Sequence, residues 1–129
     1  MQDQFTLTIL RSCSDATLVS TGDLQDVIYY INTGNSASIQ PLYTLTPAAT
    51  DPTVACKPSF YLHFWNTRKK LWVEYNALTD LFATWDPTNG ILIVNTNSYS
   101  LDTTEYLTRI TSLVTGTNFS DEFTITIKD

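Results

Sequence analysis

Apolar and polar residues alternate with a period of two along most of the chain. In the stretch QFTLTIL (residues 4–10), Phe5, Leu7 and Ile9 share one face and threonines occupy the other. The stretch EFTITIK (residues 122–128) repeats this alternation near the other end of the sequence. Side chains of a β-strand point alternately to its two faces, so both stretches are predicted to be strands with one buried face.

Further strands are predicted wherever short apolar or alternating runs lie between turn residues. The predicted strands are Ala16–Ser20, Val27–Ile31, Ser38–Leu45, Phe60–Trp65, Leu71–Tyr75, Phe82–Trp85, Ile91–Asn95, Glu105–Val114 and Glu122–Lys128. Pro41 makes Ser38–Leu45 an edge or bulged strand, because proline has no N–H to donate to a ladder. The stretch DPTNG (residues 86–90) has the composition of a tight turn, and residues 76–80 are expected to form a single helical turn. Many short strands without a long helix predict an antiparallel β-sandwich.

Composition narrows the class of protein. The chain has 129 residues, 43% hydrophobic and 16% charged, which suits a single folded domain. Its net charge of −6 disfavours nucleic acid and anionic membrane surfaces as partners. No run approaches the roughly 20 apolar residues of a membrane-spanning helix. The opening MQDQFTLTIL lacks the pattern of a signal peptide, which leaves a cytosolic protein or part of a longer or processed chain.

The two ends of the sequence resemble each other. With an offset of 118 positions, MQDQFTLTILR (residues 1–11) aligns with FSDEFTITIKD (residues 119–129). This is what one period of a tandem array with a short overlap would give. Residues 4–10 would then join neighbouring units, either within a longer array or by adding a strand to the sheet of another subunit. Alternatively, they form the first strand of their own sandwich.

The chain has two cysteines, Cys13 and Cys56. An even pair in an acidic, threonine-rich β protein suits a disulfide and an oxidising compartment. The alternative is a pair of buried thiols. Neither cysteine belongs to a CxxC pattern, so redox catalysis and zinc binding have little support.

The second half of the sequence resembles a family. The turn WDPTNG (residues 85–90), Tyr106 in the penultimate strand and FTITI (residues 123–127) are similar to the immunoglobulin-like and cadherin-like tandem repeats of large surface proteins of protists, such as ciliates, and of bacteria. FTLTILRSC (residues 5–13) resembles a junction between such repeats. The resemblance implies an immunoglobulin-like (cadherin-like) sandwich of about seven to nine strands. It further implies a junction strand at residues 1–10, a domain at residues 11–129 and an extracellular or cell-surface location.

The sequence departs from that family in its metal-binding motifs. The cadherin calcium motifs are absent as such, and we expect no metal site. Asp3 and Asp121 lie near the expected junctions, but Ca²⁺ takes six to eight oxygen ligands and a neighbour would have to supply the rest.

The hairpin at residues 60–75 is the candidate binding surface. Trp65 and Trp72 flank a turn that holds Arg68, Lys69 and Lys70. Aromatic side chains that face outward suggest a protein contact or a carbohydrate platform. The three cations suggest an electrostatic contact with an acidic patch, or simply a solvated turn.

Catalytic chemistry has little support in the sequence. His63 is the only histidine and is expected to be structural, because no nucleophile or metal motif accompanies it. The acidic pairs Asp80 with Asp86 and Asp102 with Glu105 are better explained as solvated loop residues than as a glycosidase pair. We therefore expect neither an enzyme nor a cofactor.

These observations favour a structural protein, a unit of a head-to-tail fibre or surface array. Phe5, Leu7 and Ile9 would form the strand contact between subunits, and the partners would be copies of itself or neighbouring repeats. The alternative is a carbohydrate-binding or adhesion module that uses the hairpin 60–75, with glycans as partners. Asn118 begins the glycosylation sequon NFS in a loop expected before the last strand.

Overall fold

The computed structural model describes residues 17–31, 33–46, 57–114 and 117–129. These residues form ten strands and one short 3-10 helix, η2 (Tyr99–Leu101). The strands are β1 (Thr17–Gly22), β2 (Val27–Tyr30), β3 (Ala37–Ile39), β4 (Leu42–Thr46), β5 (Ser59–Asn66), β6 (Leu71–Glu74), β7 (Ala83–Asp86), β8 (Ile91–Val94), β9 (Glu105–Val114) and β10 (Thr117–Lys128). No helix in these ranges is long and apolar enough to span a membrane.

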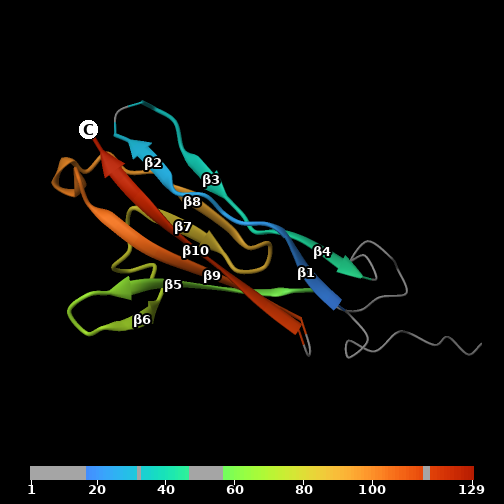
Figure 1. Ribbon diagram of the computed structural model, residues 1–129. Coiled ribbons are helices and arrows are strands. Elements are labelled where there is room, and N and C mark those ends of the chain that lie inside the picture. The colour runs from blue at the N-terminus through green and yellow to red at the C-terminus, as the bar shows by residue number, and fades with distance from the viewer. Residues whose placement is uncertain (1–16, 32, 47–56, 115–116) are drawn as a thin grey trace, which may run out of the picture.

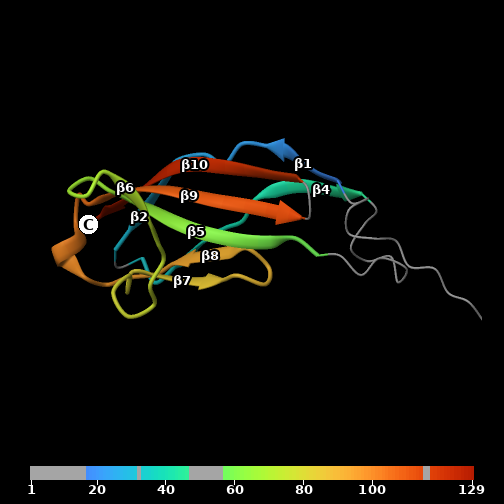
Figure 2. The same cartoon turned by 90° about the horizontal axis from the view of Figure 1, so that it is seen from below.

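Two sheets form the sandwich, and a ribbon extends one end of it. The five-stranded sheet has the order β2-β10-β9-β5-β6, and the three-stranded sheet has the order β3-β8-β7. β1 pairs with β4 to form the ribbon. Figure 2 shows β7 and β8 as a layer below β5, β9 and β10, and Figure 1 shows the ribbon at one end of the molecule. All strand pairs are antiparallel except β2 with β10, which is parallel and differs from the purely antiparallel expectation.

The main core lies between the two sheets, and the period of two builds it. Leu92, Ile110, Ile125 and Ile127 are fully buried there. A second, smaller apolar cluster lies under the ribbon and contains Leu18, Leu45 and Val114, with Tyr43 and Phe119 packed against it. The alternation in the sequence therefore predicted the buried faces correctly.

The predicted strand Ser38–Leu45 is two strands, which corrects the expectation of a single edge or bulged strand. β3 pairs with β8 in the three-stranded sheet, whereas β4 pairs with β1 in the ribbon. Gln40 and Pro41 lie between them, and Pro41 is buried. Because proline cannot donate to the ladder, the chain leaves one sheet at this point and enters the ribbon.

Side-chain hydrogen bonds tie β1 and the segment that follows it to the edge of β10. The Thr117 hydroxyl oxygen accepts a hydrogen bond from the Leu18 N–H at 3.2 Å. The Asp26 carboxylate accepts one from the Thr124 N–H at 2.8 Å. The Leu24 N–H donates to the Asp121 carboxylate. β2 has four residues and pairs only with Ile125–Lys128, so these hydrogen bonds attach the earlier part of β10 and give the Thr124 N–H a partner.

The last strand begins earlier than the sequence predicted. β10 starts at Thr117 rather than Glu122, and Asn118 pairs with Leu113 of β9. The expectation that Asn118 lies in a loop is therefore wrong, because pairing with β9 carries the strand to the end of the hairpin. Its side chain is exposed, so the sequon remains accessible.

Asp121 occupies a core position in the alternation of β10. It is only 5% exposed, and one of its carboxylate oxygens has no hydrogen-bond partner within the part of the chain that the structure describes. Burial raises the pKa of the Asp121 carboxyl above its usual range, and the Leu24 N–H opposes this shift. Because Asp121 is buried, it is not placed to bind calcium at a junction with a neighbouring repeat.

We predict that Asp121→Asn stabilises the fold at neutral pH. Because the pKa is raised in the folded state, protonated Asp121 favours folding below the unfolded pKa, and this advantage is lost as pH rises through the folded pKa. The asparagine amide keeps an oxygen for the Leu24 N–H without a buried charge, so we expect a gain of about 1 kcal/mol at pH 7 that fades towards pH 3. Urea unfolding at both pH values measures this, with the exposed neighbour Glu122→Gln as control. A loss of stability in the Asp121→Asn variant at pH 7 would contradict the prediction.

Candidate functional site

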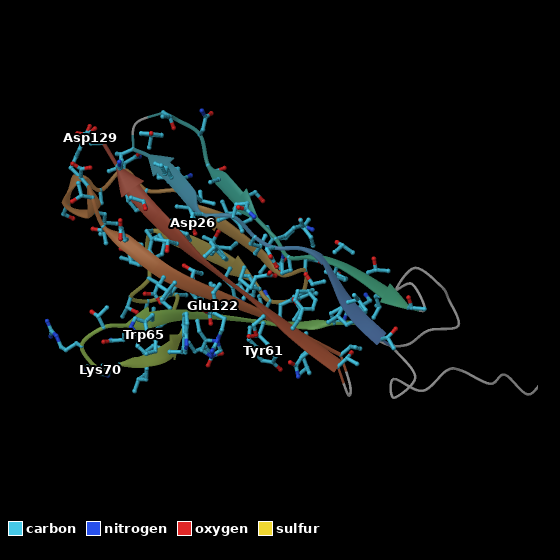
Figure 3. All side chains as sticks on the ribbon, in the orientation of Figure 1. Asp26, Tyr61, Trp65, Lys70, Glu122 and Asp129 are labelled. Carbon is cyan, nitrogen blue, oxygen red and sulfur yellow. The ribbon has the colours of Figure 1, made fainter. Side chains whose placement is uncertain are left out.

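The predicted site residues fall into two groups. Phe5, Leu7, Ile9, Cys13 and Cys56 lie outside the described residues, so the strand contact and the disulfide stay predictions. The residues of the hairpin 60–75 lie together on β5, β6 and the turn between them. Figure 3 shows Trp65 and Lys70 at this hairpin, on the opposite end of the molecule from the ribbon.

Trp65 and Trp72 are neighbours across β5 and β6. They are direct partners in the antiparallel register, and their ring centroids lie 5.5 Å apart in an edge-to-face arrangement. Both side chains are half-buried on the outer face of the five-stranded sheet. Such a pair contributes about 1 kcal/mol beyond its buried area and holds both rings in fixed positions.

Arg109 of β9 completes this aromatic pair, and nothing in the sequence pattern predicted it. The guanidinium carbon lies 4.5 Å from the centre of the Trp72 ring. A cation over the face of a tryptophan is held by the ring quadrupole, and the contact strengthens where water is excluded. The Arg109 Nε atom is buried and has no hydrogen-bond partner in the described ranges.

A row of ionisable side chains crosses the same face of the sheet. Register places Glu74 opposite His63, His63 opposite Arg109, and Arg109 opposite Glu122. Burial and the charge of Arg109 lower the pKa of His63, while Glu74 acts in the opposite direction. His63 is therefore neutral at pH 7, and its environment is that of a packed structural histidine.

The basic turn is ordered rather than loose. The Asn66 side-chain oxygen accepts hydrogen bonds from the N–H groups of Arg68 and Lys69, and its carbonyl accepts one from Lys70. Lys70 has a φ of 54°. The three cationic side chains are exposed at one end of the sheet, beside the aromatic pair.

The arrangement suits a protein contact better than a sugar platform. Arg109 covers one face of Trp72, so at most one face of that ring is open for a flat sugar to stack on. Tryptophan and arginine held rigidly on one surface are typical of interface hot spots. Glycan binding stays a prediction with weaker support.

Sequence reasoning missed Arg109 because its contact with Trp72 crosses the sheet. β9 and β6 are not adjacent, and only the order β9-β5-β6 brings the two side chains together. Parity along β9 places Arg109 on the same face as Leu107 and Thr111, but the pairing partner cannot be read from one strand.

The acidic candidates Asp80, Asp86 and Asp102 each accept hydrogen bonds that hold local backbone. Asp86 closes the turn 86–90 by accepting hydrogen bonds from Thr88 and Asn89, which lower its pKa. Asp80 accepts from the Asn76 N–H, and Asp102 accepts from the Asp129 N–H. These roles are structural. The residues that the structure describes contain no cluster of three or more side chains that could hold a metal.

Comparison with known proteins identifies the fold. No family model and no curated protein matches the chain. The solved structure of titin domain M7 is similar with a TM-score of 0.54 and 15% identity, over 87% of this chain and 94% of that one. The N-terminal eight Ig domains of Down Syndrome Cell Adhesion Molecule give a TM-score of 0.58 and 13% identity over 91% of this chain, which matches only 13% of that longer chain. The residues that the structure describes therefore have an immunoglobulin-like fold.

Proposed function

We propose that the chain is a structural module that associates head to tail with copies of itself or with neighbouring repeats. Residues 4–10 act as the junction strand, and residues 11–129 form the immunoglobulin-like domain. In an extracellular setting, a Cys13–Cys56 bridge and a glycan on Asn118 are expected. The tandem-repeat resemblance in the sequence supports this location.

The burial of β10, the strand whose sequence matches residues 4–10, supports this proposal most directly. Phe123, Ile125 and Ile127 of β10 are 2%, 0% and 0% exposed, and they correspond to Phe5, Leu7 and Ile9 in the internal match. A segment with this pattern is stable only when a sheet covers its apolar face. Burial of three such side chains provides roughly 5–8 kcal/mol before the costs of association.

The strands between Thr17 and Lys128 already form both sheets and enclose the main core. β10 has β9 on one side, with β2 and the segment tied by Asp26 on the other. This arrangement favours a neighbour's surface over β10 of the same chain as the partner of residues 4–10.

The test is self-association of a full-length variant with a disrupted apolar face. We expect the wild-type chain to form oligomers whose size grows with concentration in sedimentation velocity, and filaments or short chains in electron micrographs. Phe5→Asp/Leu7→Asp/Ile9→Asp should be monomeric with an unchanged near-UV circular dichroism spectrum. A wild-type chain that stays monomeric at high concentration, or a variant that still assembles, would refute the proposal.

A further inference from the structure

The described chain begins at one pole of the molecule, and an exposed apolar region lies at the other. Leu18 of β1 contacts Thr117 at the start of β10, and Thr103 donates to Ile127 near the end of β10. β10 has 12 residues, so the two poles lie on the order of 40 Å apart. Figure 1 shows β1 near one end and the C-terminus, the β5–β6 turn and the loop before β9 near the other. The first described residue, Thr17, thus lies at the pole that faces away from this region.

Two cavities open at this distal pole. One has a volume of about 360 Å³, with Phe64 and Val73 in its wall. The other has a volume of about 280 Å³, with Phe82 and Leu101 in its wall. Asp80 and Tyr106 line both, so the cavities lie on either side of a shared wall. We call the two together the distal groove.

Leu81 lines the second cavity, and Leu78 directly precedes Thr79, which lines both cavities. Leu78 is 85% exposed and Leu81 is 77% exposed, the two highest values among the large apolar side chains that the structure describes. Leu71 and Val73 of β6 are also exposed. Because Val73 and Leu81 line the cavities, these two differ from isolated apolar residues, which are common on protein surfaces.

The turn that carries Leu78 is held by several hydrogen bonds. Asp80 accepts a hydrogen bond from the Asn76 N–H at 2.8 Å and donates its own N–H to the Asn76 carbonyl at 2.8 Å. The Asn76 side-chain oxygen accepts from the Leu78 N–H at 2.9 Å. The Tyr75 hydroxyl donates to the Ala83 carbonyl and anchors the following chain. Leu78 is therefore held in solvent by a fixed backbone, as a preorganised contact residue would be.

The distal groove also carries negative charge in its wall. Burial, followed by the charge of Asp80, raises the pKa values of Tyr75 and Tyr106. Glu74 lines the first cavity together with Asp80. An occupant with apolar residues followed by a cation would match this combination.

Residues 5–11 of another copy have that combination. In an extended strand, the period of two would place Arg11 on the same face as Phe5, Leu7 and Ile9. Arg11 is six residues before Thr17 and can lie at most about 20 Å from it, which is short of the distal pole of its own molecule and leaves a neighbouring copy as the acceptor. β6 is the outer strand of its sheet and borders the first cavity; no strand in the described ranges pairs with its outer edge, which can pair with an extended segment.

We propose that the distal groove is the acceptor for residues 4–11 of the next copy, with Leu78, Leu81 and Val73 covering Phe5, Leu7 and Ile9 and with Arg11 beside Asp80 and Glu74. This inference rests on the head-to-tail association proposed above and names its receiving site. The described chain begins at Thr17, at the pole opposite the acceptor, so such a contact would be heterologous and would not close on itself within a pair.

The test mixes two full-length variants that are each blocked at one end. Leu78→Asp/Leu81→Asp should block the acceptor, and Phe5→Asp/Leu7→Asp/Ile9→Asp should block the donor. Each alone should be monomeric, with self-association weakened at least about 100-fold. Mixed in equal amounts, they should form one-to-one dimers and nothing larger, because one free donor segment meets one free groove. Sedimentation velocity measures all three samples, and melting curves check that each variant is folded.

Ile28→Asp is the matched control. Ile28 is 52% exposed on β2, away from the distal groove, so this variant should assemble like wild type. Wild-type assembly by the leucine variant, or no dimer on mixing, would overturn the acceptor site and leave the head-to-tail proposal standing. Assembly by the donor-blocked variant, or a monomeric wild type, would overturn both.

Discussion

Ile125→Ala should lower the free energy of unfolding by about 3–4 kcal/mol, whereas Leu7→Ala should change it by less than about 0.5 kcal/mol. The two residues occupy the same place in the internal match, on the apolar face of QFTLTIL or EFTITIK. Ile125 is fully buried in the main core, between its neighbours Val27 and Tyr106 in the sheet. Removing its side chain leaves a cavity, and such truncations typically cost about 2–5 kcal/mol.

Leu7 should behave differently if, as we propose, its apolar face is covered by another molecule rather than by its own domain. Urea unfolding of the two variants should be measured at a protein concentration at which the wild type is monomeric, so that self-association does not contribute to the free energy of unfolding. At high concentration, Leu7→Ala should instead weaken self-association and leave the monomer intact. If Leu7→Ala destabilises the dilute monomer as much as Ile125→Ala does, residues 4–10 belong to their own sandwich.

Gly90→Ala should destabilise the fold by about 2–3 kcal/mol, the second largest effect that we expect from a single substitution. Gly90 ends the turn 86–90 with a φ of 69°, a left-handed conformation that costs a residue with a side chain roughly 1 kcal/mol. An added Cβ would also lie 2.7 Å from the Phe60 ring. Phe60 is buried on β5 and packs near Tyr43, with 5.9 Å between ring centroids, so it cannot yield without disturbing its neighbours.

Gly34→Ala separates the cost of the left-handed backbone from the cost of the contact with Phe60. Gly34 has nearly the same φ, 72°, but an added Cβ would meet nothing within 4 Å. It should therefore show only the backbone cost, about 1 kcal/mol. Thermal and urea unfolding of both variants measure the difference. Equal losses at the two positions would mean that the Phe60 contact does not matter.

The two candidate surfaces lie near each other at the distal pole but differ in character. The outer face of the five-stranded sheet carries a fixed cation–aromatic group, Arg109 on Trp72, with the basic turn beside it. The distal groove is apolar and acidic, with Leu81 in its wall and the exposed Leu78 on the same turn as Thr79, which lines both cavities. In a head-to-tail assembly, the groove would be covered by the next copy and the outer face would remain open to other proteins.

The sequence alone predicted most of the described strands and the buried face of the last one. The alternation around Phe123, Ile125 and Ile127 identified a core strand, because the period of two is a local property of extended backbone. The turn DPTNG and the hairpin at residues 60–75 were likewise predicted, since turn geometry depends on a few adjacent residues. An immunoglobulin-like sandwich followed from these elements and from the resemblance.

Only the tertiary structure decided which strands are neighbours and where the chain changes sheets. Pro41 indicated an interruption, but the transfer of β4 to the ribbon depends on its pairing with β1. Arg109 contacts Trp72, and Tyr106 lines the distal groove together with Asp80, because segments far apart in the sequence lie side by side. Such contacts depend on strand order and register, which arise from packing the whole chain. Alternation and turn geometry, in contrast, depend on only a few adjacent residues.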